Sequence, residues 1–493
     1  MAADVHCGRV VALVGIAALA FLATGCETRQ ESLTKSRIRK VEKGLLRAIY
    51  LKGRRPEKLS IEARLPFYKV PGVGLAVMDR NGLEWARDYG IRDAHSREPV
   101  TTDTIFQAGD LSQPVAAAAA LELVDKGLLE LGGDMEPLLS RLLAPGPGPT
   151  PMSTVTLRKI LTHTDGLASV GLPGYPVGCQ IPALTDLLQG REFTAAGFGE
   201  ASAVPALDIC ISDAGFAVLQ ALLEETTAKT FPVLANQTVL GPFGMRHSTF
   251  DVPLPESMKL NAASGHGRDG RPIEGKWLSY PAAAARGLWT TPSDLVSFAA
   301  GVLRSATGKE GQILSAGMAR AMLTPQAGNR GLGFAVDGVG TDVRFHLEGR
   351  TRGYTCTLVV YPYKGQGAVV MTNSDNGFLI SDEILRAVSD AYEWPDFKPQ
   401  ERPLFRLDPS VYQGYVGRYQ VTPDYALDVT YEDYYLIIRP SGQSPTRFYV
   451  ENQTFFFSID PYVRIQFLSD DKGRVTGLIL WQQDFKQEAK KIG

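Results

Sequence analysis

The chain has 493 residues, enough for two or three domains that each bury a hydrophobic core. It is 44% hydrophobic and 21% charged, which is the composition of an ordinary globular protein and excludes a low-complexity chain. The formal net charge of -2 gives no indication of a nucleic-acid partner or of binding to an anionic membrane surface.

The first 26 residues predict a targeting signal. An apolar run from Val10 to Ala23 has the length of a signal-peptide core and is too short to favour a transmembrane helix. It ends in Leu22-Ala-Thr-Gly-Cys26, which is similar to a bacterial lipobox. We therefore expect cleavage before Cys26 and a lipoprotein of the cell envelope, because two or more acyl chains anchor a protein stably. The alternative is a plain secretory signal. Glu27 gives no sign of inner-membrane retention, which weakly favours the outer membrane.

Residues 27–59 are polar and basic, and they predict a tether that leads into a helix packed on the body of the protein. The apolar residues of this segment fall at helical spacing, and they are Ile38, Val41, Leu45, Leu46 and Ile49. Ser32-Leu-Thr-Lys35 matches a Ser-x-x-Lys pattern, and Ser469-Asp-Asp-Lys472 matches it again near the other end of the chain. The first has no strand before it and the second lies in a predicted hairpin turn, so both are interpreted as chance matches.

Residues 60–394 predict an α+β domain. Val70 to Met78 and Gly82 to Gly90 indicate a hairpin that turns at Arg80-Asn81-Gly82. Ile105-Phe106 indicates a strand before a Gly109-Asp110 turn, and the Ala-rich stretch that follows predicts a helix that stops at Gly127. Further helices are expected at 155–166, at 214–225, from Pro292 onwards and at 382–392, and further strands at 354–361 and 367–372. Helices around an antiparallel sheet are typical of an α+β fold.

The last hundred residues differ in pattern. Residues 395–406 are rich in proline and charge and predict a linker. Residues 407–493 contain short strand-like segments separated by turns at close intervals, which predicts a small all-β barrel or sandwich.

Phe106-Gln-Ala-Gly-Asp110-Leu-Ser-Gln113 has the frame and spacing of the motif Phe-x-x-Gly/Ala-Ser-x-Ser/Thr-Lys. That motif places the nucleophile of the penicillin-binding and class C β-lactamase-like serine hydrolases. Other stretches resemble the same family in the same order, over residues 60 to 490; they are Tyr68 to Val77, Leu157 to Gly166, Gly241 to Met245, Arg286 to Leu295, Gly331 to Phe334 and Val370 to Gly377. Tyr415 to Tyr419 and Phe455 to Phe457 resemble the lipocalin-like domain often appended to these proteins. The resemblance implies a β-lactamase/transpeptidase-like fold with a C-terminal β domain.

The family chemistry implies a serine that attacks a carbonyl, a lysine one turn later that takes its proton, a tyrosine that completes the base, and a histidine or lysine on a late strand. In this chain the matching positions hold other residues, which are Asp110 for the serine, Gln113 for the lysine, Ile211 for the tyrosine, Asp213 for the third residue of the tyrosine motif and Leu347 for the histidine. His346 is one residue away and points to the opposite face of a strand. Loss of the nucleophile alone costs about 10⁶ in turnover in a serine protease. The pattern therefore predicts no catalysis by the family mechanism.

Substitute chemistry is poorly supported by the residues at this helix tip. Ser112 has Val115 three residues later and thus has no base at that spacing, so it is interpreted as a hydroxyl with local hydrogen bonds. Asp110 is a carboxylate at a helix N-terminus, where it is electrostatically favourable without any chemistry. The chain has six histidines, no two of them at positions i and i+4, and we expect no metal or other cofactor.

Arginines stand where the family often has small or polar residues. Our hypothesis is that Asp110 pairs with Arg286, Arg350 or Arg352 and closes the former acyl pocket; the alternative is that these arginines face solvent. The candidate binding residues are Asp110, Ser112, Arg286, Arg350 and Arg352. Among Cys179, Cys210 and Cys356 one disulfide could form, and the sequence does not say which.

The favoured interpretation is a lipid-anchored, non-catalytic homologue that binds a cell-wall peptide, another envelope protein or a small ligand. It would meet the membrane only through its lipid anchor and would bind no nucleic acid. The alternatives are an active peptidase, esterase or β-lactamase of the same family, and a purely structural envelope protein.

Overall fold

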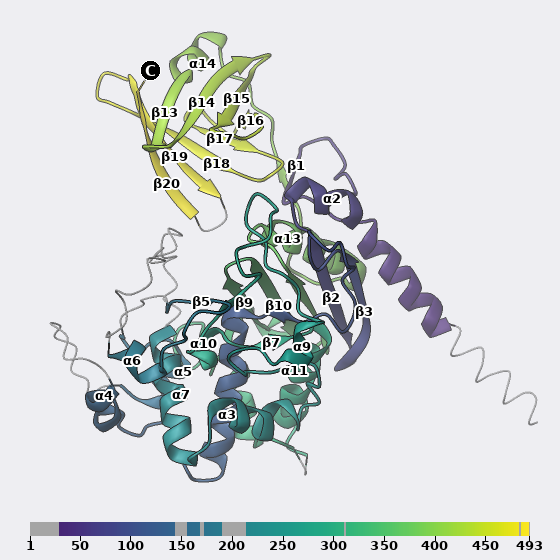
Figure 1. Cartoon of the computed structure of the whole chain (residues 1–493). Helices are drawn as coiled ribbons and strands as arrows, with labels where there is room; N and C mark the ends of the chain where they lie inside the picture. Colours follow the sequence, from purple (N-terminus) through teal and green to yellow (C-terminus); the bar gives the residue numbers. More distant parts are fainter. Residues whose placement is uncertain are drawn as a thin grey trace, which may run out of the picture.

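The computed structural model describes residues 29–142, 155–167, 172–189, 213–309, 312–482 and 485–492. The expected signal sequence and Cys26 lie outside these residues. The centre of the α+β body is an antiparallel sheet of six strands in the order β3-β2-β11-β10-β9-β8 (Figure 1). Their bounds are β2 Gly72–Asp79, β3 Gly82–Gly90, β8 Ala335–Asp337, β9 Arg344–Thr351, β10 Tyr354–Tyr361 and β11 Gln366–Thr372. In the described part of the chain, no helix has the length and apolar character needed to cross a membrane.

The β2–β3 hairpin confirms the turn expected at Arg80-Asn81. Both residues have positive φ, 53° and 60°, which is the backbone of a tight two-residue hairpin turn. The side chains of β2 alternate between two cores, as they must on a pleated strand. Val73, Leu75 and Val77 pack on one face, and Ala76 and Met78 pack on the other.

Helices cover both faces of this sheet. On one face lie α2 (Ile61–Tyr68), α13 (Gly377–Tyr392) and a helix over residues 29–42, which buries Ile38 and Val41. This helix ends before Leu45 and Leu46, which were expected to belong to it, and Ile49 begins strand β1 (Ile49–Leu51). The opposite face is covered by α3 (Ser112–Asp125), α7 (Asp213–Thr227), α10 (Ala283–Arg286) and α11 (Pro292–Ala306). Two further expectations needed correction. Helix α5 covers only Leu157–Leu161, and α13 begins at Gly377 rather than at Asp382, because its first turn packs Phe378 and Ile380 against the body.

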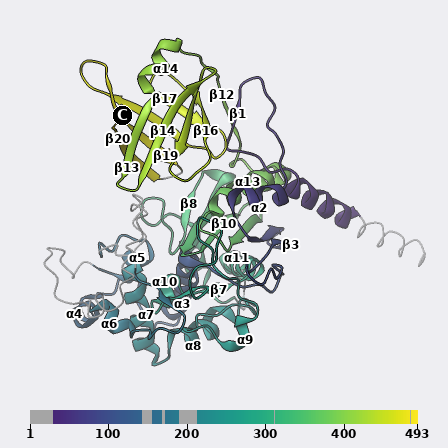
Figure 2. The same ribbon diagram turned by 45° about the horizontal axis from the view of Figure 1, so that its top comes forward.

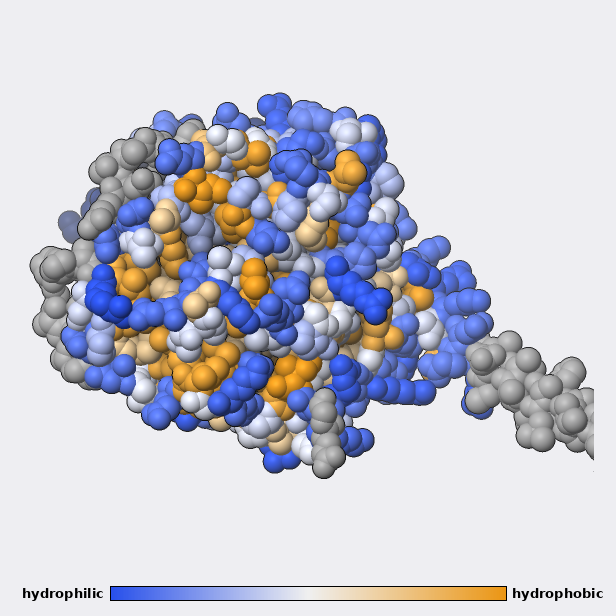
Figure 3. Space-filling view, turned by 60° about the horizontal axis from the view of Figure 1, so that its bottom comes forward, coloured by the Kyte–Doolittle hydropathy of each residue, from blue (hydrophilic) through white to orange (hydrophobic). Residues whose placement is uncertain are grey.

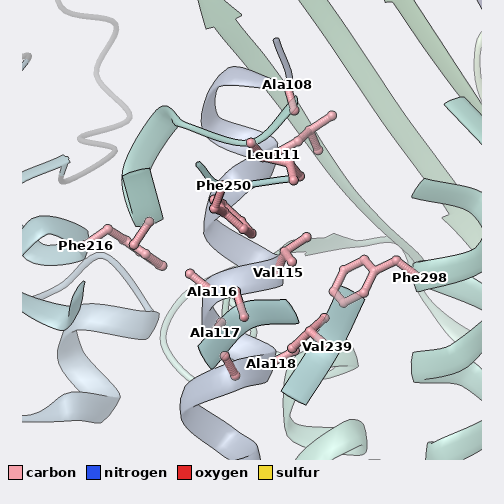
Figure 4. Close-up of a cluster of buried hydrophobic side chains, with 14 of the residues drawn as sticks. Ala108, Leu111, Val115, Ala116, Ala117, Ala118, Phe216, Val239, Phe250 and Phe298 are labelled. Atoms are coloured by element: carbon pink, nitrogen blue, oxygen red, sulfur yellow. The ribbon is translucent and has the colours of Figure 1, made fainter. Parts of the chain in front are cut away.

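Helix α3 is fully enclosed by its neighbours. Its alanine run allows α7 and α10 to approach closely, because alanine adds only a methyl group to the helix surface. Figure 4 shows the cluster around its first two turns, where the helix residues meet the aromatic rings of neighbouring elements; the labelled members are Ala108, Leu111, Val115, Ala116, Ala117, Ala118, Phe216, Val239, Phe250 and Phe298. The helix ends at Asp125, and Gly127 has a φ of 71°, which confirms the expected glycine stop.

The C-terminal part forms a closed barrel; the sequence had left open whether it would be a barrel or a sandwich. Eight antiparallel strands form it; they are β13 Gly417–Thr422, β14 Tyr425–Glu432, β15 Tyr435–Pro440, β16 Thr446–Val450, β17 Phe455–Ser458, β18 Arg464–Ser469, β19 Val475–Gln482 and β20 Phe485–Lys491. Helix α14 (Pro409–Tyr415) lies at one end of the barrel (Figure 2). Its residues Tyr412 and Tyr415 are buried in the barrel core. Side chains therefore fill the centre of this barrel, as they do in small barrels generally.

The segment expected to be a linker takes part in secondary structure. Strand β12 (Gln400–Arg402) pairs in parallel with β1 (Ile49–Leu51), so the N-terminal segment and the connection to the barrel form one small sheet. Beside it, Ile49 and Leu51 pack against Phe457 of the barrel. The N-terminal segment is therefore part of the joint between the two units.

A buried charge network completes this joint. Arg64 of α2 is 4% exposed and contacts Glu383 of α13 at 2.7 Å and Asp460 of the barrel at 2.6 Å. Arg47 reaches the same Asp460 carboxylate at 2.8 Å. Burial raises the pKa of the Glu383 carboxyl although Arg64 opposes the shift, so this carboxylate depends on its cation. The network connects an early helix, the closing helix and the barrel.

Replacement of Arg64 by methionine should lower the free energy of unfolding by about 3–5 kcal/mol, because Glu383 would remain buried without a cation and Asp460 would keep only Arg47. Urea denaturation followed by fluorescence measures the change. The matched control is Lys58→Met, which removes an exposed pair with Asp390 and should change stability by less than about 1 kcal/mol. Equal effects of the two substitutions would contradict this account of the joint.

Candidate active-site cleft

The tip of α3 is pressed against strand β9. Strand β4 (Phe106–Gln107) pairs with β7 (Trp289–Thr290), and a 3₁₀ turn η1 (Gly109–Leu111) follows it and leads into α3. Gly109 has a φ of 57°, and a Cβ there would lie 2.4 Å from the backbone nitrogen of Arg350. A Cβ at Gly349 would lie 2.0 Å from the carbonyl oxygen of Ala108. Only glycine fits at either position, so the backbone fixes where residue 110 points.

Asp110 lies at this tip with its side chain 7% exposed. Its Oδ2 accepts a hydrogen bond from the backbone N–H of Arg350 at 3.1 Å. Its Oδ1 lies 3.5 Å from Nε of Arg286, the last residue of α10. The ion pair that the sequence suggested is therefore present with Arg286. Of the other two candidates, Arg350 contributes its backbone to Asp110 while its guanidinium lies 3.9 Å over the ring of Phe378, and Arg352 is exposed.

Arg286 has a second carboxylate partner. Its Nη2 lies 2.9 Å from Oδ2 of Asp213, the first residue of α7, which is 2% exposed. Burial raises the pKa of Asp213 to about 6, with Arg286 lowering it and the Asp110 charge raising it. Burial also disfavours the charged guanidinium, but the two carboxylates together raise the pKa of Arg286 above its ordinary value. One cation therefore holds two acid groups from separate helices, an arrangement we call the Asp110–Arg286–Asp213 triad.

Several polar atoms around the triad make no hydrogen bond with the described part of the chain. They are Oδ1 of Asp110, Oδ1 of Asp213, Nε of Arg286, and both Oε1 and Nε2 of Gln113. Gln113 is fully buried on the first turn of α3. Buried polar groups nearly always have partners, so each of these atoms has hydrogen-bonding capacity that the described residues leave unused.

Ser112 is used by the fold itself. Its hydroxyl donates to the carbonyl oxygen of Gly109 at 2.7 Å and accepts from the backbone N–H of Leu288 at 3.0 Å. The residue has no exposed surface. The expectation of a hydroxyl engaged in local hydrogen bonds is confirmed, and these contacts leave its oxygen poorly placed to meet a ligand.

The position that corresponds to the histidine of the family motif is apolar and buried. Leu347 on β9 is 4% exposed and faces the core, whereas His346 points to the other side and lies 2.7 Å from Asp337. Ile211 lies outside the described residues. Gln113 carries no group that accepts a proton near neutral pH. Around the helix tip, the described residues thus provide hydrogen-bonding groups and charge but no nucleophile with an adjacent base.

Two further expectations concern cysteines and metals. Cys179 is exposed and Cys356 is buried, and neither is in a disulfide; Cys210 lies outside the described residues. The Cys356 thiol donates to the carbonyl oxygen of Gln107 at 3.2 Å, and burial raises its pKa, which makes it unreactive. No cluster of three or more histidine, cysteine, aspartate or glutamate side chains suited to a metal occurs among the described residues.

Sequence reasoning missed the role of Asp213. It was identified only as a replaced motif position, and the sequence alone did not connect it to Arg286. A signal was present, because an aspartate at the start of an otherwise apolar helix is a charge that needs a partner.

Comparisons with known proteins agree with the fold of the α+β body. The family model described as Beta-lactamase matches residues 60–391. A beta-lactamase of Pseudomonas fluorescens is 25% identical over 241 residues, which is 48% of this chain and 62% of that protein. Penicillin-binding protein 4 of Amycolatopsis lactamdurans is 27% identical over 326 residues, 62% of this chain and 81% of that protein. The octameric penicillin-binding protein homologue from Pyrococcus abyssi shares the fold with a TM-score of 0.54 at 18% identity, over 86% of this chain and 97% of that chain.

Substitution Arg286→Met should lower the free energy of unfolding by about 3 kcal/mol at neutral pH, because two buried carboxylates lose their cation. The loss should shrink as the pH falls from about 8 to about 5. Asp213 already has a raised pKa, so the folded state holds its proton at higher pH than the unfolded state, and ionisation on raising the pH weakens folding. Without Arg286 the pKa of Asp213 should rise further. The pH range over which its ionisation lowers the free energy of unfolding then extends to higher pH.

Urea denaturation at a series of pH values measures both effects. Arg271→Met is the control, because this side chain is 86% exposed and its loss should leave the pH profile unchanged. An Arg286→Met profile parallel to that of the unaltered chain would contradict the triad.

Proposed function

The chain belongs to the beta-lactamase family, and we propose that it is a non-hydrolytic member that acts by binding a ligand at the cell envelope. The observation that carries the proposal is the triad. At the helix tip, where the resemblance implies a nucleophilic serine, a carboxylate is held by a backbone N–H and by Arg286. That carboxylate has Gln113 one turn later, which cannot serve as a base.

The cleft keeps hydrogen-bonding capacity that the described residues do not use. Oδ1 of Asp213 can accept a hydrogen bond and the Gln113 amide can both accept and donate, whereas Oδ1 of Asp110 faces Nε of Arg286 in the ion pair. Each unsatisfied buried group costs about 1–3 kcal/mol, so a ligand that satisfies several of them gains affinity from groups that would otherwise destabilise the fold. A peptide backbone fits this pattern, because its N–H groups meet carboxylates and its amides pair with a glutamine amide. We therefore propose a cell-wall peptide, or an extended segment of an envelope protein, as the ligand.

The proposed location follows from Cys26. Acylation of this residue would hold the β-lactamase-like body next to a membrane of the cell envelope, where cell-wall peptides occur. The outer membrane is the preferred site because Glu27 follows the cysteine.

The rival function is hydrolysis by groups other than those of the family motif, as in an esterase, peptidase or β-lactamase. It is favoured by one observation, which is that a carboxylate at a helix tip can act as a nucleophile. The tight engagement of Asp110 by Arg286 and by the Arg350 N–H argues against this role, since both interactions lower the nucleophilicity of the carboxylate.

The full chain should form no covalent adduct with a fluorescent penicillin and should not hydrolyse a chromogenic cephalosporin or a nitrophenyl ester. The double variant Asp110→Ser, Gln113→Lys should also stay inactive, because Arg286 remains in the pocket and Ile211 and Leu347 remain in place of the tyrosine and histidine. Mass spectrometry of the intact protein detects any acyl adduct. Turnover by either protein would show that the chain is an enzyme.

Substitution Gln113→Met should separate a binding site from a purely structural one. It removes two buried polar atoms without hydrogen-bond partners and should raise the free energy of unfolding by about 1 kcal/mol in the absence of ligand. The same change should abolish the stabilisation that soluble peptidoglycan fragments give to the unaltered chain in thermal unfolding. The matched control Gln220→Met alters a glutamine that already bonds Pro281 and Ala284, and it should destabilise the fold. If the fragments stabilise neither the unaltered chain nor the Gln220→Met variant, the proposed ligand is wrong.

A further inference from the structure

A basic stripe lies on the helix over residues 29–42, remote from the cleft. Lys35, Arg39 and Lys43 are spaced four residues apart, so they lie on one side of the helix, with Lys43 directly after its last residue. Arg87 of β3 joins them around a cavity of about 360 Å³. All four side chains are exposed, and within the described part of the chain no carboxylate is within ion-pair distance of any of them. We call these four residues the basic stripe.

The orientation of the stripe is fixed by the opposite side of the same helix. Arg37 contacts Asp79 and Glu84 of the β2–β3 hairpin, each at 3.0 Å, and its guanidinium lies 4.3 Å over the ring of Tyr392. Ile38 and Val41 are buried against the body. The contacts of Arg37, Ile38 and Val41 with the body therefore fix the stripe on the outer side of the helix.

The one acidic residue that lines the cavity is engaged elsewhere. Glu42 accepts a hydrogen bond from the Tyr89 hydroxyl at 3.1 Å. Arg29 and Lys40 add two more exposed cations to the same helix. In Figure 3 the helix projects from the body beside the grey atoms, and hydrophilic residues cover most of its surface. A chain with a net charge of -2 thus concentrates positive charge on one projecting element.

We propose that the basic stripe binds the anionic headgroups of a lipid bilayer and lays the first helix along the membrane surface. The position of the stripe favours this occupant over an acidic protein. Residue 29 is three positions after Cys26 in the sequence, a span of at most about 10 Å. An anchor at Cys26 would therefore keep the start of the helix close to one Debye length, about 8 Å at physiological ionic strength, from the headgroups. Basic residues beside a lipid anchor strengthen membrane attachment in this way.

The inference uses none of the triad residues and is separate from the proposed ligand, but it rests on the lipid anchor at Cys26 that the proposed function includes. If it holds, the barrel and the cleft are given a set orientation toward the bilayer, since the helix packs rigidly on the body. A single acyl-anchored cysteine would instead leave the body free to rotate about a tether.

The test uses the chain from residue 27 onward, which has neither the apolar signal sequence nor the acylated cysteine, and two kinds of vesicle. One kind is phosphatidylcholine alone, and the other is phosphatidylcholine mixed with phosphatidylglycerol. The chain should prefer the vesicles with phosphatidylglycerol, and the preference should fall as salt is added. The triple variant Lys35→Gln, Arg39→Gln, Lys43→Gln should lose about a hundredfold in affinity for them, at about fivefold per basic residue. Its binding to phosphatidylcholine alone should not change.

A matched control removes the same charge elsewhere. Lys229, Arg246 and Lys309 are exposed on other parts of the body, and their replacement by glutamine should leave vesicle binding intact. Thermal unfolding of both triple variants checks that the fold is unchanged, because glutamine has nearly the helix propensity of lysine and arginine. The proposal is overturned if the control variant loses as much affinity as the stripe variant, or if the unaltered chain shows no preference between the two kinds of vesicle.

Discussion

The approach of the α3 tip to strand β9 is the contact on which the cleft depends. Gly109 and Gly349 bring two backbones so close that a methyl group on either would collide with a main-chain atom. This contact places Asp110 opposite the N–H of Arg350 and beside Arg286. A residue at this point is presented at a helix N-terminus, where negative charge is favourable. The same geometry that suits an attacking hydroxyl in this family therefore also suits a fixed carboxylate.

The triad sets the electrostatics of the α3 tip. Asp110 and Asp213 would repel each other if both were ionised in a buried place, and Arg286 compensates both charges. The compensation is incomplete, because several oxygen and nitrogen atoms around the triad lack hydrogen-bond partners in the described chain. Natural proteins rarely keep such groups without a reason. Around the triad the described residues therefore keep unused hydrogen-bonding groups and supply no nucleophile with an adjacent base.

The barrel and the body are joined by structure rather than by a free linker. Strands β1 and β12 pair across the chain, and Asp460 of the barrel meets Arg47 and Arg64 of the N-terminal segment. The first helix is held to the body by Arg37, which leaves its basic stripe on the outside. The N-terminal segment thus connects three parts of the protein, the sheet, the barrel and the proposed membrane surface, and any orientation imposed on this segment is passed to the other two.

Features of this protein that depend on neighbouring residues could be predicted from the sequence by itself. The α+β body, the Arg80-Asn81 turn, the alanine helix with its Gly127 stop, the family resemblance and the replaced catalytic positions were all readable, because each rests on neighbouring residues. Only the tertiary structure decided the rest. It selected Arg286 from three arginines, added Asp213 from a segment a hundred residues beyond Asp110, closed the last eight strands into a barrel and paired the expected linker with β1. These are contacts between distant segments, and no local propensity encodes which side chains meet when the chain folds.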